Sequence, residues 1–203
     1  MSKGNLIVFS GPSGSGKGTI LKAYLDSNNG KNAAISVSAT TRAPRPGEIH
    51  GVNYFFLSKQ EFEETIQNDG FLEYAKFCDN YYGTLKSEVQ KKLDQGIDVI
   101  LEIEVQGAMN IKRQIPDAVM IFVIPPSFKE LRQRLVNRGT ETEDVIDKRI
   151  GTALKEVEYI NEYTYVIIND KLDEAVSEFD AILKSEKLKV NKNTNTIQEV
   201  CKL

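Results

Sequence analysis

The stretch LIVFSGPSGSGKGT, residues 6–19, places a short apolar segment directly before a glycine-rich loop. Leu6 to Ser10 is nearly all apolar, as expected for a buried strand of a parallel sheet. Gly11, Gly16 and Lys17 fit the phosphate-binding pattern G-x-x-x-x-G-K-[S/T], which joins a strand to a helix. Glycines let backbone N–H groups converge on an anion, while the helix N-terminus and the lysine add positive charge. The stretch therefore predicts a bound nucleoside triphosphate.

One position of this loop departs from the pattern. Gly18 stands where a Ser or Thr hydroxyl would ligate Mg²⁺, and Thr19 comes one residue later. Successive helical residues point about 100° apart, so Thr19 does not simply replace that hydroxyl. Mg²⁺ readily keeps its waters and needs few direct protein ligands. We therefore expect Mg²⁺ to be held mainly by phosphates and water, with Glu102 or Thr19 as candidate protein groups.

Three further apolar runs have the length of buried strands: 99–105, 119–124 and 165–169. Helical patterns separate or follow them, beginning at residue 17 and spanning about 84–95, 108–114, 128–138 and 143–161. Ser127 and Glu130 form a capping-box pattern at the start of one of these helices. Strands that alternate with helices predict an α/β protein, here a P-loop three-layer fold with a parallel core sheet.

The region of about residues 36–87 breaks this alternation. It is rich in Gly, Pro, Arg and aromatic residues, with one helix signal near 58–68 and strand-like segments ISVSATT, NYFFLS and FLEYAKF. We interpret it as a small inserted α+β subdomain, with residues 1–35 and 88–187 as the core and 188–203 as a loosely held polar tail. Arg42 and Arg45 flank Pro44 in the insert, and two guanidinium groups on a stiffened loop suit a phosphate.

Composition limits the classes of partner. The 203 residues are 40% hydrophobic and 27% charged, and a net charge of −3 predicts no general affinity for nucleic acid. No apolar run approaches the roughly 20 residues that span a bilayer. Cys78 and Cys201 match no metal or redox spacing, which predicts a reducing cytoplasm, and His50 is interpreted as a loop residue. We expect a monomer or small homo-oligomer that binds neither membrane nor nucleic acid.

Six segments resemble guanylate kinases in their order and separation. They are GPSGSGKGT, SVSATTRAPRPGEIHGVNYFF, FLEYAKFCDNYYGT, LEIEVQGA, RGTETEDVIDKRI and YVIIND, and the resemblance covers about residues 5–185. The arginine-rich and NYYGT segments are more specific than the phosphate loop. The resemblance implies a nucleoside monophosphate kinase that transfers the γ-phosphoryl group of ATP to GMP, and to dGMP, with Mg²⁺. ATP and GMP are then its small-molecule partners.

The resemblance also implies roles for individual residues. It implies ATP contacts for Gly11, Pro12, Ser13, Gly14, Ser15, Gly16, Lys17, Gly18, Thr19, Arg134, Asn169 and Asp170. It implies a GMP-binding insert with contacts from Ser38, Arg42, Arg45, Tyr54, Glu73, Tyr82, Gly83, Thr84, Glu102 and Glu104. It implies catalytic roles for Lys17, Arg42, Arg138 and Arg149, the last two in a mobile lid at about 138–149.

The chemistry of guanine agrees with the implied role of Glu73. Guanine presents N1–H and a 2-amino group side by side, and one carboxylate accepts from both, whereas adenine has no such donor pair. Glu102 and Glu104 alternate with Ile103, so we expect both on one face of the predicted strand. The family often has aspartate at one or both positions. Which of the two glutamates orders the metal and which approaches GMP is therefore left open.

Two other functions are compatible with parts of the sequence. A catalytically silent guanylate-kinase-like module would bind phosphopeptides in the GMP cleft, but such modules usually lack a working phosphate loop, and Gly16 and Lys17 are present here. A kinase of a phosphorylated sugar or of another monophosphate would use the same scaffold. Ser38, Glu73 and Thr84 argue against that second alternative, because together they fit guanine.

Overall fold

The computed structural model describes residues 3–137, 139 and 142–201 of the chain. At its centre is a five-stranded sheet in the order β2-β7-β1-β8-β9, in which every neighbouring pair is parallel. Its strands are β1 (Leu6–Ser10), β2 (Ala33–Ile35), β7 (Asp98–Glu102), β8 (Val119–Ile124) and β9 (Tyr165–Ile168). The sequence predicts four of them. It misses β2, which has three residues and is too short to show an apolar pattern.

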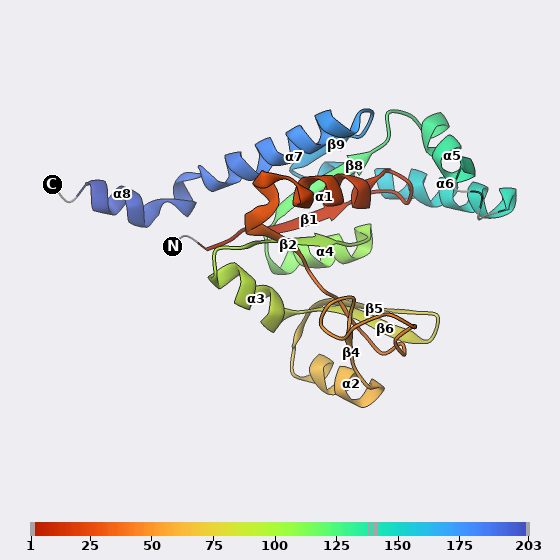
Figure 1. The fold of residues 1–203 in the computed structure, drawn as a ribbon, viewed down its shortest axis with the longest axis horizontal. Helices are drawn as coiled ribbons and strands as arrows, with labels where there is room; N and C mark the ends of the chain where they lie inside the picture. The colour runs from red at the N-terminus through yellow and green to blue at the C-terminus, as the bar shows by residue number, and fades with distance from the viewer. Residues whose placement is uncertain (1–2, 138, 140–141, 202–203) are drawn as a thin grey trace.

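Helices cover both faces of this sheet, as Figure 1 shows. They are α1 (Lys17–Asp26) and α7 (Leu172–Lys187) on one face, and α3 (Lys86–Asp94) and α4 (Val105–Gln114) on the other. Alternate residues of β1 enter different apolar clusters: Ile7 packs with α1 and α7, whereas Val8 packs with α3 and α4. The predicted three-layer α/β fold is therefore confirmed. Sequence analysis missed α7, although Ala175, Phe179 and Leu183 recur every four residues and are all buried.

A second, mixed sheet lies below the core in Figure 1, in the order β4-β3-β6-β5. Its elements are β3 (Ala39–Thr40), β4 (Phe55–Phe56), α2 (Lys59–Gln67), β5 (Phe71–Phe77) and β6 (Asn80–Leu85). Phe62 of α2 is fully buried and stacks on Phe71 and Tyr81, with ring centroids 4.2 and 5.2 Å away. The predicted strand ISVSATT is wrong as one element, because Ile35 ends β2 of the core sheet and Ala39 begins β3 of the small sheet.

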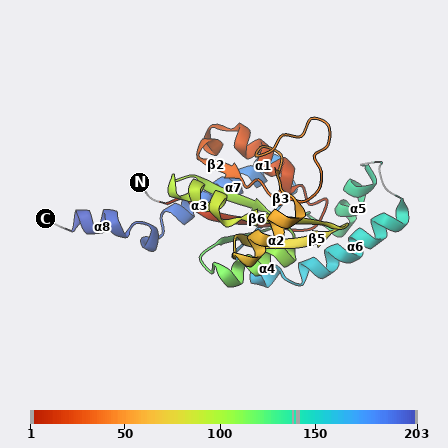
Figure 2. The ribbon, with the colours of Figure 1, turned by 90° about the horizontal axis from the view of Figure 1, so that it is seen from below.

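Helices α5 (Phe128–Asn137) and α6 (Glu143–Val157) pack on each other at one end of the molecule (Figure 2). Only one half of the predicted capping box forms: the Ser127 hydroxyl accepts from the Glu130 N–H at 3.1 Å, while the Glu130 carboxylate accepts from Arg134 Nε at 2.9 Å. The predicted helix 143–161 ends at Val157, and a 3₁₀ turn, η2 (Ile160–Glu162), follows it.

The polar segment after residue 188 contains more regular structure than its composition predicts. A 3₁₀ turn, η3 (Val190–Lys192), leads into α8 (Thr194–Val200), which projects from the body in both views (Figures 1 and 2). Its apolar side chains Ile197 and Val200 are exposed. Among all helices in the described residues, none is both long and apolar enough to cross a bilayer.

Candidate functional site

The loop between β1 and α1 has a backbone shape suited to binding phosphate. Gly11, Gly14 and Gly16 have φ angles of 141°, 92° and 91°, which residues with a Cβ rarely adopt. Lys17 is the first residue of α1, and its ammonium group donates to the carbonyl oxygens of Gly11 at 2.6 Å and Pro12 at 3.0 Å. The lysine charge therefore lies over the loop, next to a helix N-terminus that favours anions.

Gly11 is also fixed by its neighbour strand, which gives a stability prediction. A Cβ at this position would stand 2.1 Å from the carbonyl oxygen of Val123, a backbone atom of β8. We expect Gly11→Ala to lower the free energy of unfolding by about 3 kcal/mol or more, from strain at positive φ plus a backbone clash. Gly47→Ala is the control, because Gly47 also has a positive φ of 87° but open space around it. Urea unfolding of both variants tests this, and equal losses would contradict it.

Asn169, which follows β9, closes the loop from the other side. Its side-chain amide donates to the Ser15 carbonyl at 2.8 Å, and Arg134 donates to the Asn169 carbonyl at 3.0 Å. A Cβ at Gly16 would lie 2.2 Å from Asn169 Nδ2, so only glycine permits this approach. The buried Ser15 hydroxyl has no hydrogen-bond partner within the described part of the chain. The adjoining cavity has a volume of about 300 Å³ and is lined by Gly14, Gly16, Thr19, Arg134, Asn169, Asp170 and Leu172.

One face of helix α6 approaches the loop at two positions. Arg149 Nη1 donates to Ser13 Oγ at 2.8 Å, and Glu156 follows seven residues, or about two turns, later. Burial raises the pKa of the Glu156 carboxyl, and the Lys17 charge opposes that shift. Sequence reasoning missed Glu156, although its spacing from Arg149 is a usable signal. The predicted Arg138 lies outside the described residues. Glu156 lines a second cavity, of about 270 Å³, with Gly11, Ser13, Lys17, Glu102, Ile103 and Glu104.

Glu102 and Glu104 reach this second cavity from different elements. Strand β7 ends at Glu102, opposite Phe9 of β1, and Glu104 is the N-cap of α4. The prediction that both lie on one strand face is therefore wrong, because the chain leaves the sheet after Glu102 and turns into a helix. The Glu102 carboxylate oxygens lie 3.8 and 3.9 Å from the place where a Cβ on Gly18 would stand. Glycine at this position leaves room beside the carboxylate.

The donor set of this cavity suits a metal ion that is shared with phosphates. In residues 3–137, 139 and 142–201, no three His, Cys, Asp or Glu side chains gather closely enough to hold an ion by themselves. Glu102 and Glu104 nevertheless line the same cavity as Lys17. Two carboxylates with space for water fit Mg²⁺, which binds proteins through one or two carboxylates plus substrate phosphates. Thr19 lines the other cavity, with Arg134.

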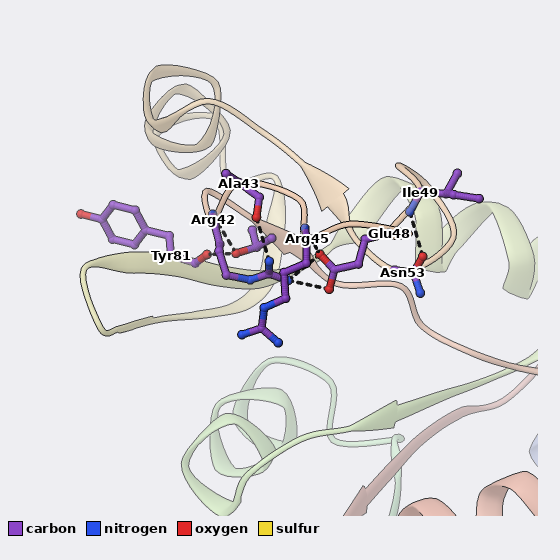
Figure 3. A network of polar contacts seen from close by, with 8 residues as sticks. Arg42, Ala43, Arg45, Glu48, Ile49, Asn53 and Tyr81 are labelled. Carbon is purple, nitrogen blue, oxygen red and sulfur yellow. Dashed lines mark hydrogen bonds and ion pairs between the residues drawn. The ribbon is translucent and has the colours of Figure 1, made fainter.

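Arg42 is held in a polar network on the insert (Figure 3). Its Nη2 lies 2.9 Å from both carboxylate oxygens of Glu48, and Glu48 Oε2 also accepts from the backbone N–H of Arg45 at 2.7 Å. The guanidinium carbon stands 5.4 Å from the centroid of the Tyr54 ring, a cation–π distance. The ion pair raises the pKa of Arg42 and lowers that of Glu48. Sequence reasoning missed Glu48, because its pairing with Arg42 depends on the folded shape of the loop.

Glu73 occupies the side of the insert that faces the core. Its carboxylate accepts from the Thr84 hydroxyl at 2.7 Å, and Oε2 lies 3.5 Å from the place where a Cβ on Gly107 of α4 would stand. Burial raises the pKa of Glu73, and the Thr84 hydrogen bond opposes this effect. A Cβ at Gly83 would lie 2.9 Å from the Glu73 carbonyl oxygen, so this strand pair also needs a glycine.

The predicted residues thus fall into two groups. Around α1 lie the loop residues 11–19 with Glu102, Glu104, Arg134, Arg149, Asn169 and Asp170. On or next to the small sheet lie Ser38, Arg42, Arg45, Tyr54, Glu73, Tyr82, Gly83 and Thr84. The rings of Tyr54 and Tyr82 are 6.2 Å apart, so the two predicted tyrosines are neighbours.

Comparison with known proteins identifies the family. The family profile described as guanylate kinase matches residues 3–186. The chain belongs to the guanylate kinase family. The guanylate kinase of Caldanaerobacter subterraneus subsp. tengcongensis is 51% identical over 191 residues, which cover 94% of this chain and 92% of that protein. The guanylate kinase of Clostridioides difficile (strain 630) is 51% identical over 199 residues, which cover 98% and 96%.

A solved structure agrees with this assignment. The crystal structure of guanylate kinase from Anaplasma phagocytophilum superposes with a TM-score of 0.71 at 30% identity and covers 95% of this chain and 90% of its own. As a guanylate kinase, the protein is a phosphotransferase with GMP as acceptor, and the kinase prediction is confirmed. The phosphopeptide-binding module and the kinase of another phosphorylated substrate are not favoured.

Proposed function

We propose that this guanylate kinase transfers the γ-phosphoryl group of Mg·ATP directly to GMP or dGMP, through the residues described above. The observation that carries the proposal is the partly buried Glu73 carboxylate, which is oriented by Thr84 and faces α4. Such a carboxylate accepts from the N1–H and 2-amino groups of guanine together. The Arg42 and Arg45 loop on the same small sheet supplies the phosphate grip.

ATP binds at the loop and the cavity beside it. The loop N–H groups, Lys17 and the N-terminus of α1 hold the phosphates, and the unpartnered Ser15 hydroxyl is available to them. The nucleoside occupies the cavity between Arg134, Asn169 and Asp170. That cavity lies beyond the carboxyl end of β9, where open parallel sheets bind ligands.

Catalysis relies on positioning and positive charge. Charge spreads over the equatorial oxygens during phosphoryl transfer, so Lys17, Arg42, Arg138 and Arg149 act by stabilising it. Mg²⁺ neutralises phosphate charge when it is bound, and Glu102 and Glu104 would hold it through its water shell. Both glutamates line the cavity with Lys17, and the nucleoside cavity has a different lining, so the glutamates act at the phosphate end of ATP.

One segment of the core is proposed to move during the reaction. The segment 138–149 acts as a lid that excludes water, with the Arg149–Ser13 contact as its link to the loop. In this proposal the chain has three parts: a core of residues 1–35 and 88–187, a GMP-binding insert of residues 36–87, and a tail of residues 188–203. We further propose a monomer or small homo-oligomer that binds no membrane or nucleic acid. A cytoplasmic location is supported by Cys78 and Cys201, which are exposed and form no disulfide.

The test is phosphoryl transfer from Mg·ATP, followed by coupled ADP release, with GMP, dGMP, AMP, CMP and UMP as separate acceptors. We expect turnover with GMP and dGMP only, because only guanine matches Glu73. Removing Mg²⁺ with a chelator should abolish turnover, and adding Mg²⁺ back should restore it. Comparable turnover with AMP would contradict the assigned base recognition, and full activity in chelator would contradict the metal.

A further inference from the structure

The Glu48 carboxylate contacts both arginines of the insert loop, the side chain of Arg42 and the backbone of Arg45. Arg42 Nη2 lies 2.9 Å from Glu48 Oε1 and 2.9 Å from Oε2, and Arg42 Nη1 donates to the Ala43 carbonyl at 2.7 Å. These contacts leave donors of the guanidinium, which has five N–H groups, for a ligand. Arg42 is therefore held in place while keeping hydrogen-bonding capacity for a phosphate.

The pair is sheltered by aromatic rings. The side chains of Arg42 and Glu48 are only 17% and 19% exposed. The guanidinium carbon lies 5.4 Å from the Tyr54 ring centroid and 5.9 Å from that of Phe56. A sheltered, charge-assisted hydrogen bond is stronger than a solvated surface pair. The orientation of Arg42 is thus fixed by Glu48 and the two aromatic rings, without a bound ligand.

Glu48 also closes the backbone of the loop. Its Oε2 accepts from the Arg45 N–H at 2.7 Å, and its own N–H donates to the Arg45 carbonyl at 3.0 Å. Pro44 and Pro46 further restrict this segment. One carboxylate therefore sets the side chain of Arg42 and the backbone of Arg45 together, as Figure 3 shows.

We propose that Glu48 is a positioning residue for binding of the GMP phosphate. Its carboxylate preorganises Arg42 and the Arg45 backbone without touching GMP. The inference rests on the proposed phosphate binding by these two arginines. Preorganisation strengthens binding because the ordering of long side chains is completed before the ligand arrives. A carboxylate that merely competed with phosphate for Arg42 would have the opposite effect, and its removal would strengthen GMP binding.

The test is steady-state kinetics of Glu48→Gln. The amide oxygen can take the place of Oε2, but the amide carries no charge, and its NH₂ group cannot accept from Arg42 as Oε1 does. We expect the KM for GMP to rise by about ten-fold, the loss of one charge-assisted hydrogen bond, with kcat and the KM for ATP little changed. An unchanged or lower KM for GMP would overturn the proposal.

Two further measurements separate positioning from a general loss of structure. Guanosine lacks the phosphate, so its binding by calorimetry should be the same in wild type and Glu48→Gln; a parallel loss for guanosine would overturn the proposal. Glu48→Asp keeps the charge but shortens the reach, so it should also raise the KM for GMP. An unchanged KM in Glu48→Asp would mean that charge alone matters, which contradicts positioning.

Control variants distinguish this inference from the proposed function. Glu61→Gln alters a carboxylate of the same insert that accepts from the Ser58 N–H at 2.7 Å, and it should leave the KM for GMP unchanged. Arg42→Ala should raise that KM by more than Glu48→Gln does, and adding Glu48→Gln to it should have little further effect. If Arg42→Ala has no effect, the proposed phosphate site is wrong. If only Glu48→Gln has no effect, the positioning role alone is wrong.

Discussion

Lys17→Ala is expected to lower kcat by on the order of 10³-fold, because it removes a charge that stabilises the transferring phosphoryl group. Lys17 begins α1 and lies over the loop, 2.6 Å from the Gly11 carbonyl oxygen and 3.0 Å from that of Pro12. No other lysine lines this cavity in the described part of the chain. Coupled ADP release at saturating ATP and GMP measures the loss.

Lys22→Ala is the matched control for this prediction. It removes the same charge from the same helix, but Lys22 is exposed and lines neither of the two cavities beside the loop. We expect Lys22→Ala to keep nearly full kcat, so an effect of net charge or of helix stability would appear in both variants. Binding of GMP to Lys17→Ala should stay normal because the insert is untouched. A kcat for Lys17→Ala within ten-fold of wild type would contradict the proposed role.

Glu73→Gln is expected to lower kcat/KM for GMP by on the order of 10²-fold or more, since an amide cannot accept from both the N1–H and the 2-amino group of guanine. The preference for GMP over AMP should shrink by a similar factor. Competition between the two nucleotides in the coupled assay measures it. Glu63→Gln on the exposed face of α2 is the control and should preserve the preference. Unchanged selectivity in Glu73→Gln would contradict guanine recognition by this carboxylate.

The Glu73→Gln variant is also expected to be at least as stable as wild type at neutral pH. Burial raises the folded-state pKa of Glu73 above its unfolded value, so the folded state binds protons more tightly. Stability from this group therefore falls as pH rises through the interval between the two pKa values, and the ionised form is unfavourable at neutral pH. Glu73→Gln removes that charge, and we expect an equal or higher Tm at neutral pH. A lower Tm that is the same at every pH would contradict this account.

GMP binding should strengthen as pH rises, whereas the contribution of Glu73 to stability falls. The carboxylate must be ionised to accept two donors from guanine, so the KM for GMP should rise as pH falls through the raised pKa of Glu73. The second ionisation of a phosphate monoester such as GMP has a pKa of about 6, so guanosine is the better probe. Guanosine binding should weaken with acid in wild type and stay flat in Glu73→Gln.

Local patterns made the core and the loop predictable from sequence. Leu6 to Ser10 is an apolar run, and Gly11, Gly16 and Lys17 follow it at fixed spacing, so strand, turn and helix are all set within fourteen consecutive residues. The buried strands β7 and β8 are apolar runs for the same reason, because both faces of the sheet are covered there, whereas the edge strand β9 is apolar although Val166 and Ile168 are exposed. Small elements such as β2 and β3 have too few residues to show a pattern.

Several side-chain positions and contacts were decided only by the tertiary structure. Sequence alone determined the phosphate loop, the parallel core and, through six ordered segments, the kinase family. It did not show that Glu156 of α6 shares a cavity with Lys17, or that Glu104 stands at the N-cap position of α4 and not on a strand. Nor did it reveal that Glu48 holds Arg42. The reason is physical: a local pattern reports which face of an element is buried, whereas the partner of a charged side chain depends on where the packed elements bring other charges.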